Sequence, residues 1–265
     1  MHVQPIGFFF PQDAIGNVLN PTRQDLIPVH WRPLIEEVLD QYRQRLGEQL
    51  HSVWLRGSVA RGTAVDGISD LDTFALIHGQ DVIRWQSANW EREVGDQLAP
   101  RFPFVNQIEF QLNSRVADMG HEFPLISMII ATQSLCLWGD DIRSQLPVYR
   151  PGRQMCLYYR WIAQDVADFM KKESMSEADC RGLMKTFIRA GFELVMERQQ
   201  RFTLDLFCCC QAFSEHYAYK SAEMCQALAY FITPPVDFYL LRKFVSELGT
   251  WLIEEVNFIF GKQTS

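Results

Sequence analysis

The amino-acid sequence predicts an α/β (α+β) domain with a small mixed sheet at residues 1–145, followed by an all-α helical-bundle domain at residues 146–265. The sheet is predicted by an apolar run that enters a Gly-Ser turn and returns as a second apolar run within 53–77, and by strict polar–apolar alternation at 104–112. The bundle is predicted because the apolar residues after the Pro- and Gly-containing linker at 147–152 show no strand pattern.

The elements of the first domain follow from the spacing of apolar residues and from Gly and Pro at their ends. A helix is expected where apolar residues recur every three or four positions, and a strand where short apolar runs are bounded by turn residues. In chain order, we expect an irregular start at 1–20, a helix at 31–47, strands at 51–56 and 70–78, a helix at 81–98, a strand at 104–112 and a helix at 116–132, which leads into a short apolar run at 134–142.

The second domain is expected to contain only helices. Its segments are long enough and periodic enough for a bundle that forms a core of its own. The expected helices are 153–172, 177–200, 203–217, 220–231 and 236–260.

The most informative motif is Gly57-Ser58 followed by Asp70 and Asp72 at the start of an apolar strand. Side chains two residues apart on a strand point to the same face, so the two carboxylates should lie together. Magnesium binds one or two carboxylates and completes its shell with water and phosphate. Gly57 and Ser58 stand where a helix should begin, and the first backbone N–H groups of a helix can hold an anion. The motif therefore predicts a site for a metal-bound nucleoside triphosphate.

An Asp-x-Asp pair after Gly and Ser also occurs in many surface turns, but here it opens a long apolar strand. The stretch resembles the signature of the nucleotidyltransferase superfamily that includes DNA polymerase beta and the antibiotic (aminoglycoside-type) nucleotidyltransferases. Gly57, Ser58, Asp70 and Asp72 match that signature, with one residue more than usual between the Ser and the first Asp. The resemblance implies two Mg²⁺ ions bound by the aspartates, and a nucleotide bound by Gly57, Ser58 and Arg61.

Glu109 lies on the polar face of the expected strand, between Gln107 and Gln111. The residue pattern fits a solvated surface residue and a functional carboxylate equally well. The resemblance implies the second, because the superfamily has a third acidic residue on a strand after the Asp-x-Asp strand. We expect Glu109 to be the general base or a third metal ligand. The Leu-Trp-Gly-Asp segment at 137–140 is similar to the last strand of antibiotic nucleotidyltransferase domains.

Basic residues recur on the second helix of the bundle, where Arg181, Lys185 and Arg189 are spaced four apart. Like charges at this spacing repel by a few tenths of a kcal/mol per pair, so a solvated basic face, eased by Glu193, is one interpretation. The resemblance implies another, because superfamily members with a helical second domain use its Lys or Arg to hold the triphosphate. We expect Lys185 and Arg189 to bind the nucleotide, and Arg181 less so.

Composition excludes several classes of protein. A net charge of −7 argues against binding that depends on nucleic-acid phosphates. The seven cysteines lack paired metal-ligand spacing, and we interpret the consecutive Cys208, Cys209 and Cys210 as small core residues in a reducing compartment. Neither a signal peptide nor a membrane span is expected, so the predicted location is cytoplasmic.

The predicted reaction is magnesium-dependent transfer of a nucleoside monophosphate, with AMP from ATP as the first choice, to a hydroxyl group of a small molecule. An acidic protein suits a cationic acceptor, such as an aminoglycoside-like antibiotic. One alternative is nucleotidylation of a protein, as in the minimal antitoxin-like nucleotidyltransferases, whose Gly-Ser-x-Ala-Arg-Gly turn is close to that at 57–62. Another is a non-catalytic nucleotide-binding sensor. The large helical domain speaks against the first alternative, and the presence of all three acids against the second.

Overall fold

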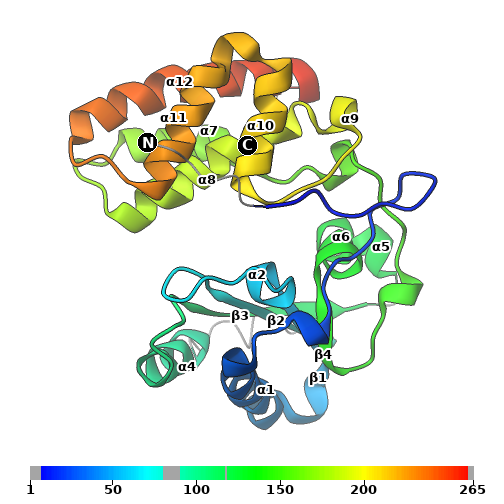
Figure 1. Cartoon of the computed structure of the whole chain (residues 1–265). Coiled ribbons are helices and arrows are strands. Elements are labelled where there is room, and N and C mark those ends of the chain that lie inside the picture. The colour runs from blue at the N-terminus through cyan, green and yellow to red at the C-terminus, as the bar shows by residue number, and fades with distance from the viewer. Residues whose placement is uncertain (1–6, 80–89, 117, 262–265) are drawn as a thin grey trace. The chain divides into compact units, whose positions relative to one another are not determined.

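The structure is a computed structural model, which describes residues 7–79, 90–116 and 118–261. The chain divides into two compact units, each with its own internal packing. One unit is Leu19–Tyr149, and the other joins the N-terminal segment up to Val18 to the chain from Arg150 onward. Figure 1 shows the sheet of the first unit and the helices of the second.

The first unit is built on a four-stranded mixed sheet with the strand order β3-β2-β1-β4. Strand β1 pairs antiparallel with β2 and β4, whereas β2 and β3 are parallel. A parallel pair needs a crossover connection, and the chain between β2 and β3 includes helix α4. The strand bounds are β1 Leu50–Arg56, β2 Leu71–His78, β3 Ile108–Arg115 and β4 Leu135–Gly139.

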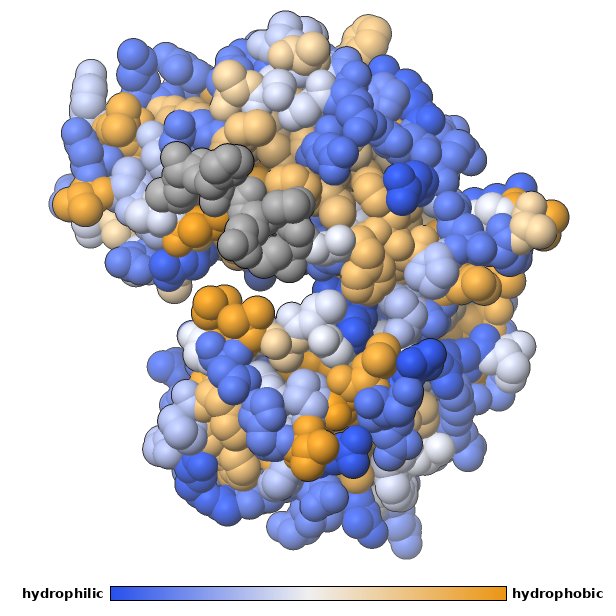
Figure 2. Space-filling model, viewed as in Figure 1, coloured by the Kyte–Doolittle hydropathy of each residue, from blue (hydrophilic) through white to orange (hydrophobic). Residues whose placement is uncertain are grey.

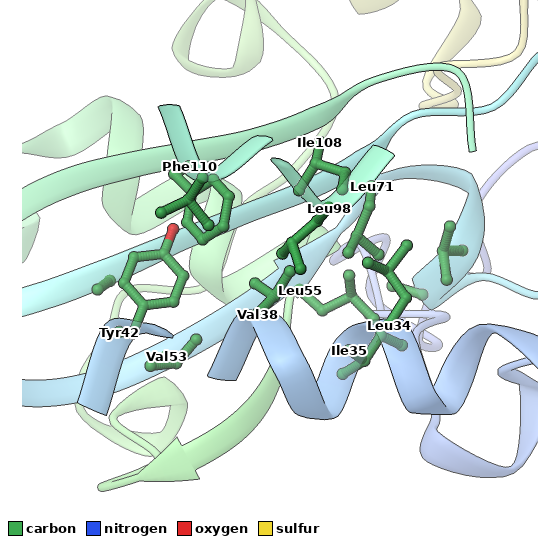
Figure 3. Packing of buried hydrophobic residues seen from close by; sticks show 14 of the residues in the cluster. Leu34, Ile35, Val38, Tyr42, Val53, Leu55, Leu71, Leu98, Ile108 and Phe110 are labelled. Carbon is green, nitrogen blue, oxygen red and sulfur yellow. The ribbon is translucent and has the colours of Figure 1, made fainter. Parts of the chain in front are cut away.

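Helices cover the two faces of this sheet, because β1 and β2 carry large apolar side chains on both faces. Val53 and Leu55 pack with α1 on one face, as Figure 3 shows, while Trp54 and Phe74 stack on the other. The helix bounds are α1 Arg32–Leu46, α2 Gly57–Ala60, α4 Trp90–Leu98, α5 Met119–Glu122 and α6 Pro124–Gln133. Short 3-10 turns lie at Gln24–Leu26, Val29–Trp31, Gly47–Gln49, Ala99–Arg101 and Arg143–Gln145.

The predicted helix at 116–132 is wrong as a single element, because the structure has two helices there. Asp118 caps α5 by accepting the N–H of His121 at 3.1 Å. Phe123 then leaves the helical conformation, with φ −131° and ψ 64°, and Pro124 begins α6. A residue before proline is disfavoured in the α region, which accounts for the break. The first half of the helix expected at 81–98 lies outside the described residues, and the second half is α4.

The second unit is helical in its described part, as predicted. Helix α8 lies at its centre and packs against α7, α10, α11 and α12. The helix bounds are α7 Ile162–Met170, α8 Glu177–Glu193, α9 Met196–Gln199, α10 Leu206–His216, α11 Ser221–Ile232 and α12 Phe238–Phe260. Further 3-10 turns lie at Arg153–Met155, Tyr158–Arg160 and Ala218–Lys220.

Hydrophilic side chains cover much of the face shown in Figure 2, and hydrophobic side chains occur between them in both units. Such a mixture is ordinary, because a folded chain has too little polar surface to cover itself completely. No helix among the described residues combines the length and the hydropathy that crossing a bilayer requires.

The structure differs from the predicted division at residue 145, because the N-terminal segment belongs to the helical unit. The N–H of Phe10 donates to the carbonyl of Phe202 at 2.7 Å, and the hydroxyl of Thr203 donates to the carbonyl of Phe8 at 2.7 Å. The carboxylate of Asp205 accepts the N–H of Phe8 at 3.0 Å. These bonds to distant residues satisfy backbone N–H and C=O groups of an extended segment, which has no helical or strand periodicity.

Candidate active site

The turn after β1 begins with Gly57, where the chain enters the one-turn helix α2. Gly57 has φ +79°, a conformation that glycine adopts without steric cost. The carbonyl of Ser58 accepts the N–H groups of Arg61 at 3.2 Å and Thr63 at 2.9 Å, which closes the turn. The structure thus places the start of a helix at the Gly-Ser pair, where the sequence predicted it.

Asp72 lies directly against Gly57. Its register partner on β1 is Arg56, so the aspartate stands beside the residue that precedes the turn. A Cβ atom built on Gly57 would be 2.1 Å from Oδ2 of Asp72, far inside van der Waals contact. The carboxylate therefore occupies the space that any side chain at position 57 would need.

Glu109 is the neighbour of Asp72 across the parallel β2–β3 pair. The backbone hydrogen bonds of the sheet hold the two residues side by side, at the ends where both strands begin. Thr73 reinforces this register, because its hydroxyl donates to the backbone carbonyl of Glu109 at 2.7 Å. The buried hydroxyl of Tyr42 is 3.1 Å from the same Thr73 oxygen, which ties the pair to α1.

Arg56 bridges the two carboxylates. Its Nη2 atom lies 3.5 Å from Oε2 of Glu109 and 3.7 Å from Oδ1 of Asp72. We did not single out this arginine from the sequence, although it directly precedes Gly57. It is the last residue of β1, and its register partner on β2 is Asp72. Its guanidinium offsets part of the negative charge that the carboxylates concentrate.

The pKa of Glu109 is raised above the usual value of a glutamate. Burial is the largest cause, and the negative charge of Asp72 is the second, while Arg56 acts in the opposite direction. Its side chain nevertheless remains 31% exposed, so a ligand can reach it. A partly buried carboxyl whose pKa is shifted toward neutrality is suited to accepting a proton from a substrate.

Asp70 precedes β2 and is held by a different partner. The side-chain amide of Asn106 donates to its Oδ1 atom at 2.8 Å. Among the described residues, no three His, Cys, Asp or Glu side chains are gathered closely enough to hold a metal ion. The predicted use of Asp70, Asp72 and Glu109 as three ligands of metal therefore stays a prediction.

The chemistry of these donors nevertheless suits magnesium. All three offer carboxylate oxygens, which hard divalent cations prefer. Two of them lie side by side in a partly buried place, where their repulsion raises the pKa of Glu109. A bound cation would relieve that repulsion, so the residues fit a magnesium ion.

The other predicted nucleotide ligands lie in different surroundings. Arg61 follows α2 in the same unit and is only 8% exposed, so most of its side chain packs inside the protein. Lys185 and Arg189 lie on α8 of the helical unit. The guanidinium of Arg189 hydrogen-bonds to the hydroxyl of Tyr158, lies 4.9 Å from the centre of that ring, and donates to the carbonyl of Leu204 at 3.0 Å. Contact of Arg61, Lys185 and Arg189 with a nucleotide stays a prediction.

Glu193 is not the surface acid that the sequence suggested. It is buried, and its carboxylate accepts the backbone N–H groups of Leu157, Tyr158 and Tyr159 at 2.6, 2.9 and 2.8 Å. These bonds explain why the predicted helix at 153–172 is shorter, since amides committed to a distant carboxylate cannot continue a helix. Burial raises the pKa of Glu193 to about 7, against the effect of the three N–H groups.

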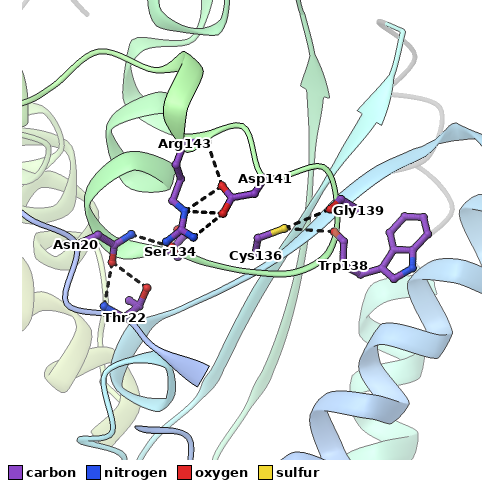
Figure 4. A network of polar contacts seen from close by, with 8 residues as sticks. All are labelled: Asn20, Thr22, Ser134, Cys136, Trp138, Gly139, Asp141 and Arg143. Carbon is purple, nitrogen blue, oxygen red and sulfur yellow. Dashed lines mark hydrogen bonds and ion pairs between the residues drawn. The ribbon is translucent and has the colours of Figure 1, made fainter. Parts of the chain in front are cut away.

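The Leu-Trp-Gly part of the segment at 137–140 ends the edge strand β4, and Figure 4 shows polar contacts of this strand and of the residues next to it. Asp141, the second acid after the strand, accepts hydrogen bonds from the guanidinium of Arg143, and these lower its pKa. Nearby, the amide of Asn20 donates to the carbonyl of Ser134 at 2.8 Å. The hydrogen bond of Asn20 therefore holds the residue before β4, and those of Asp141 hold the turn after it.

Comparison with known proteins supports the same fold. No protein-family model matches the chain, and no curated protein is significantly similar to it in sequence. A solved structure that matches is the spectinomycin adenyltransferase AAD(9) from Enterococcus faecialis, determined with ATP and spectinomycin. The match has a TM-score of 0.50 and 12% sequence identity, and it covers 83% of this chain and 98% of that one. The chain therefore shares the fold of an antibiotic nucleotidyltransferase, with an α/β domain on a small mixed sheet and a helical region.

Proposed function

We propose that the protein is a magnesium-dependent nucleotidyltransferase, which moves a nucleoside monophosphate from a triphosphate to a hydroxyl group of a small molecule. AMP from ATP is the preferred group, because the adenyltransferase that shares the fold was determined with ATP. The observation that carries the proposal is the pairing of Asp72 with Glu109, on neighbouring strands beside the turn at Gly57.

Glu109 acts as the general base in this proposal. It takes the proton of the attacking hydroxyl, and the upward shift moves its pKa toward neutral pH, where a general base is most effective. Arg56 holds the carboxylate in place from the side of Asp72. The Gly57–Ser58 turn and Arg61 bind the phosphates through backbone N–H groups and positive charge.

Asp70 and Asp72, with Glu109 as a further ligand, would hold the magnesium. A bound ion supplies positive charge that stabilises the entering and leaving oxygens of phosphoryl-type transfer. The two aspartates would present it to the phosphates, because Asp70 directly precedes β2 and Asp72 is the second residue of that strand. Lys185 and Arg189 bind the triphosphate from the helical unit, where each charge-assisted contact contributes about 1.5–3 kcal/mol.

The acceptor that we propose is a cationic small molecule of the aminoglycoside-like antibiotic type. A cavity of about 500 Å³ lies against β3, and its lining carries the acidic Glu91, Asp96 and Glu109 together with the basic Arg92. Three carboxylates and one guanidinium leave the lining with an excess of negative charge, which favours positively charged groups. The structure of the adenyltransferase that shares the fold was determined with spectinomycin, so an antibiotic acceptor is consistent with that comparison.

The test is pyrophosphate release by the purified protein with Mg²⁺, each nucleoside triphosphate and a panel of cationic antibiotics. Asp72→Asn should abolish turnover and keep the fold, because the side chain is a partly exposed carboxylate and not a core residue. Asp40→Asn is the matched control, since Asp40 lies exposed on α1 and pairs only with its neighbour Arg43 among the ion pairs described. Full turnover in a folded Asp72→Asn protein would overturn the proposal.

A further inference from the structure

Two cysteines of the helical unit lie in direct contact. The Sγ atoms of Cys210 on α10 and Cys225 on α11 are 3.7 Å apart. All seven cysteines lie in the described part of the chain, and none of the other five has a sulfur hydrogen-bonded to another sulfur there. The sequence shows no sign of this pair, because the two residues are fifteen positions apart and meet only when the helices pack.

The two thiols differ in their surroundings. Cys210 is 4% exposed, and burial raises the pKa of its thiol to about 12. Cys225 is exposed to solvent. A dissolved oxidant therefore reaches Cys225 first, and the buried sulfur of Cys210 is in contact with the sulfur of Cys225.

We propose that Cys210 and Cys225 form an oxidant-sensitive dithiol, which a peroxide converts into a disulfide within the chain. The Cys225 thiolate attacks one peroxide oxygen and the O–O bond breaks; the leaving hydroxide takes the proton that the thiol had released, which gives a sulfenic acid and one water. The Cys210 sulfur then attacks the Cys225 sulfur; the S–S bond forms, the S–O bond breaks, and a second water leaves with the Cys210 proton. Two thiols are oxidised, and one hydrogen peroxide is reduced to two waters.

The local packing supports a bond within the chain. A disulfide needs an S–S separation of about 2 Å, so the sulfurs must approach from van der Waals contact. Cys225 is exposed and can change its rotamer at low cost, whereas Cys210 is fixed in the core. A Cβ on Gly191 of α8 would be 2.4 Å from Met224 and 3.2 Å from Phe213, so α10 and α11 both press closely on α8. This packing keeps the two sulfurs together.

The bond would join α10 to α11 and restrain both against α8. In a reducing compartment the dithiol form prevails, and thiol reductants reverse the bond after an oxidative episode. The oxidised protein should therefore unfold at a higher temperature than the reduced protein, because the cross-link restricts the unfolded chain.

The test is oxidation of the fully reduced whole protein by stoichiometric hydrogen peroxide, followed by tryptic mapping without reductant. Lys220 lies between the two cysteines, so trypsin separates them into peptides that only a disulfide can join. We expect the joined peptide, with the loss of two hydrogen atoms, reversal by dithiothreitol, and a higher thermal midpoint of the oxidised form.

Variants identify the pair. Cys225→Ser should abolish the joined peptide and the thermal shift, and its exposed position should leave the fold unchanged. Cys210→Ser should let the sulfenic acid accumulate on Cys225, where dimedone traps it; this separates Cys210 from Cys208 and Cys209 in the same peptide. Cys136→Ser is the matched control and should oxidise like the wild type. A Cys225 that stays reduced while other thiols react, or a bond that forms only between molecules, would overturn the proposal.

Discussion

Glu109 combines partial burial, a carboxylate neighbour in Asp72 and the guanidinium of Arg56 at 3.5 Å. If it is the general base, Glu109→Gln should lower turnover by about 10²–10⁴-fold and leave nucleotide affinity unchanged. If it is a metal ligand, nucleotide affinity should fall as well. Single-turnover rates and equilibrium nucleotide binding, measured side by side, separate the two roles. Unchanged turnover would return Glu109 to the status of a surface residue.

The raised pKa of Glu109 also predicts two pH dependences. The turnover of the wild type should rise with pH as the carboxyl loses its proton. The stability should behave oppositely, because a folded-state pKa above the unfolded value stabilises the protein at low pH and loses that effect as the pH rises through it. Glu109→Gln should therefore raise the thermal midpoint at neutral pH but not below pH 4.5, the unperturbed value, in melts with EDTA.

Gly57 should be intolerant of any side chain, and another glycine of this unit provides the control. Gly57→Ala adds a Cβ to a residue with φ +79° and drives it against Oδ2 of Asp72. Gly67 has φ +75°, but a Cβ there would meet nothing within 4 Å. Both variants should lose about 1–2 kcal/mol of stability through backbone strain, and only Gly57→Ala should lose turnover in addition. Equal turnover in the two variants would show that Asp72 need not occupy that position.

At the scale of the element, Arg181 and Lys185 lie one turn apart on α8 and differ in their ion pairs. Arg181 pairs with Glu177 at 3.0 Å, so the basic face is less repulsive than its spacing suggested. No ion pair of Lys185 occurs among the described residues. If Lys185 holds the triphosphate, Lys185→Ala should raise the nucleotide dissociation constant about ten- to hundredfold, since 1.4 kcal/mol corresponds to a factor of ten.

Calorimetric titration with a non-hydrolysable nucleotide and Mg²⁺ measures this effect. Arg181→Ala is the control and should leave the affinity unchanged, and the thermal midpoint of Lys185→Ala should stay the same or rise slightly. An unchanged dissociation constant for Lys185→Ala would assign Lys185 to a solvated face of α8.

Elements with a local cause were predictable from the sequence. Helix α1 and strands β1 and β2 lie within one residue of their predicted bounds, because their periodicity and the glycine at position 47 act locally. The late start of α7, relative to the predicted helix at 153–172, was not predictable. Its cause is Glu193, which is more than thirty residues away in the chain and binds the backbone N–H groups before α7. The break at Phe123 had a local cause in Pro124, which the apolar pattern concealed.

At the scale of the whole molecule, the fold class was predicted correctly, and the residues that share the candidate site were predicted in part. The motif indicated Gly57 and Asp72, and the resemblance added Glu109; the structure places Asp72 beside both of them. Arg56 was missed, because its role depends on strand register and not on any motif. The N-terminal segment was assigned to the wrong unit for a similar reason, since extended chain carries no periodicity that reveals its partner.

The parallel ladder between β2 and β3 has a consequence for how such proteins diverge. Backbone amides and carbonyls set the spacing of the ladder, so nearly any side chains that fill the core can maintain it. A chain can in this way share its fold with an adenyltransferase at 12% identity. Proteins that share this fold should therefore be compared by the pairing of their strands before they are compared by the order of their amino acids.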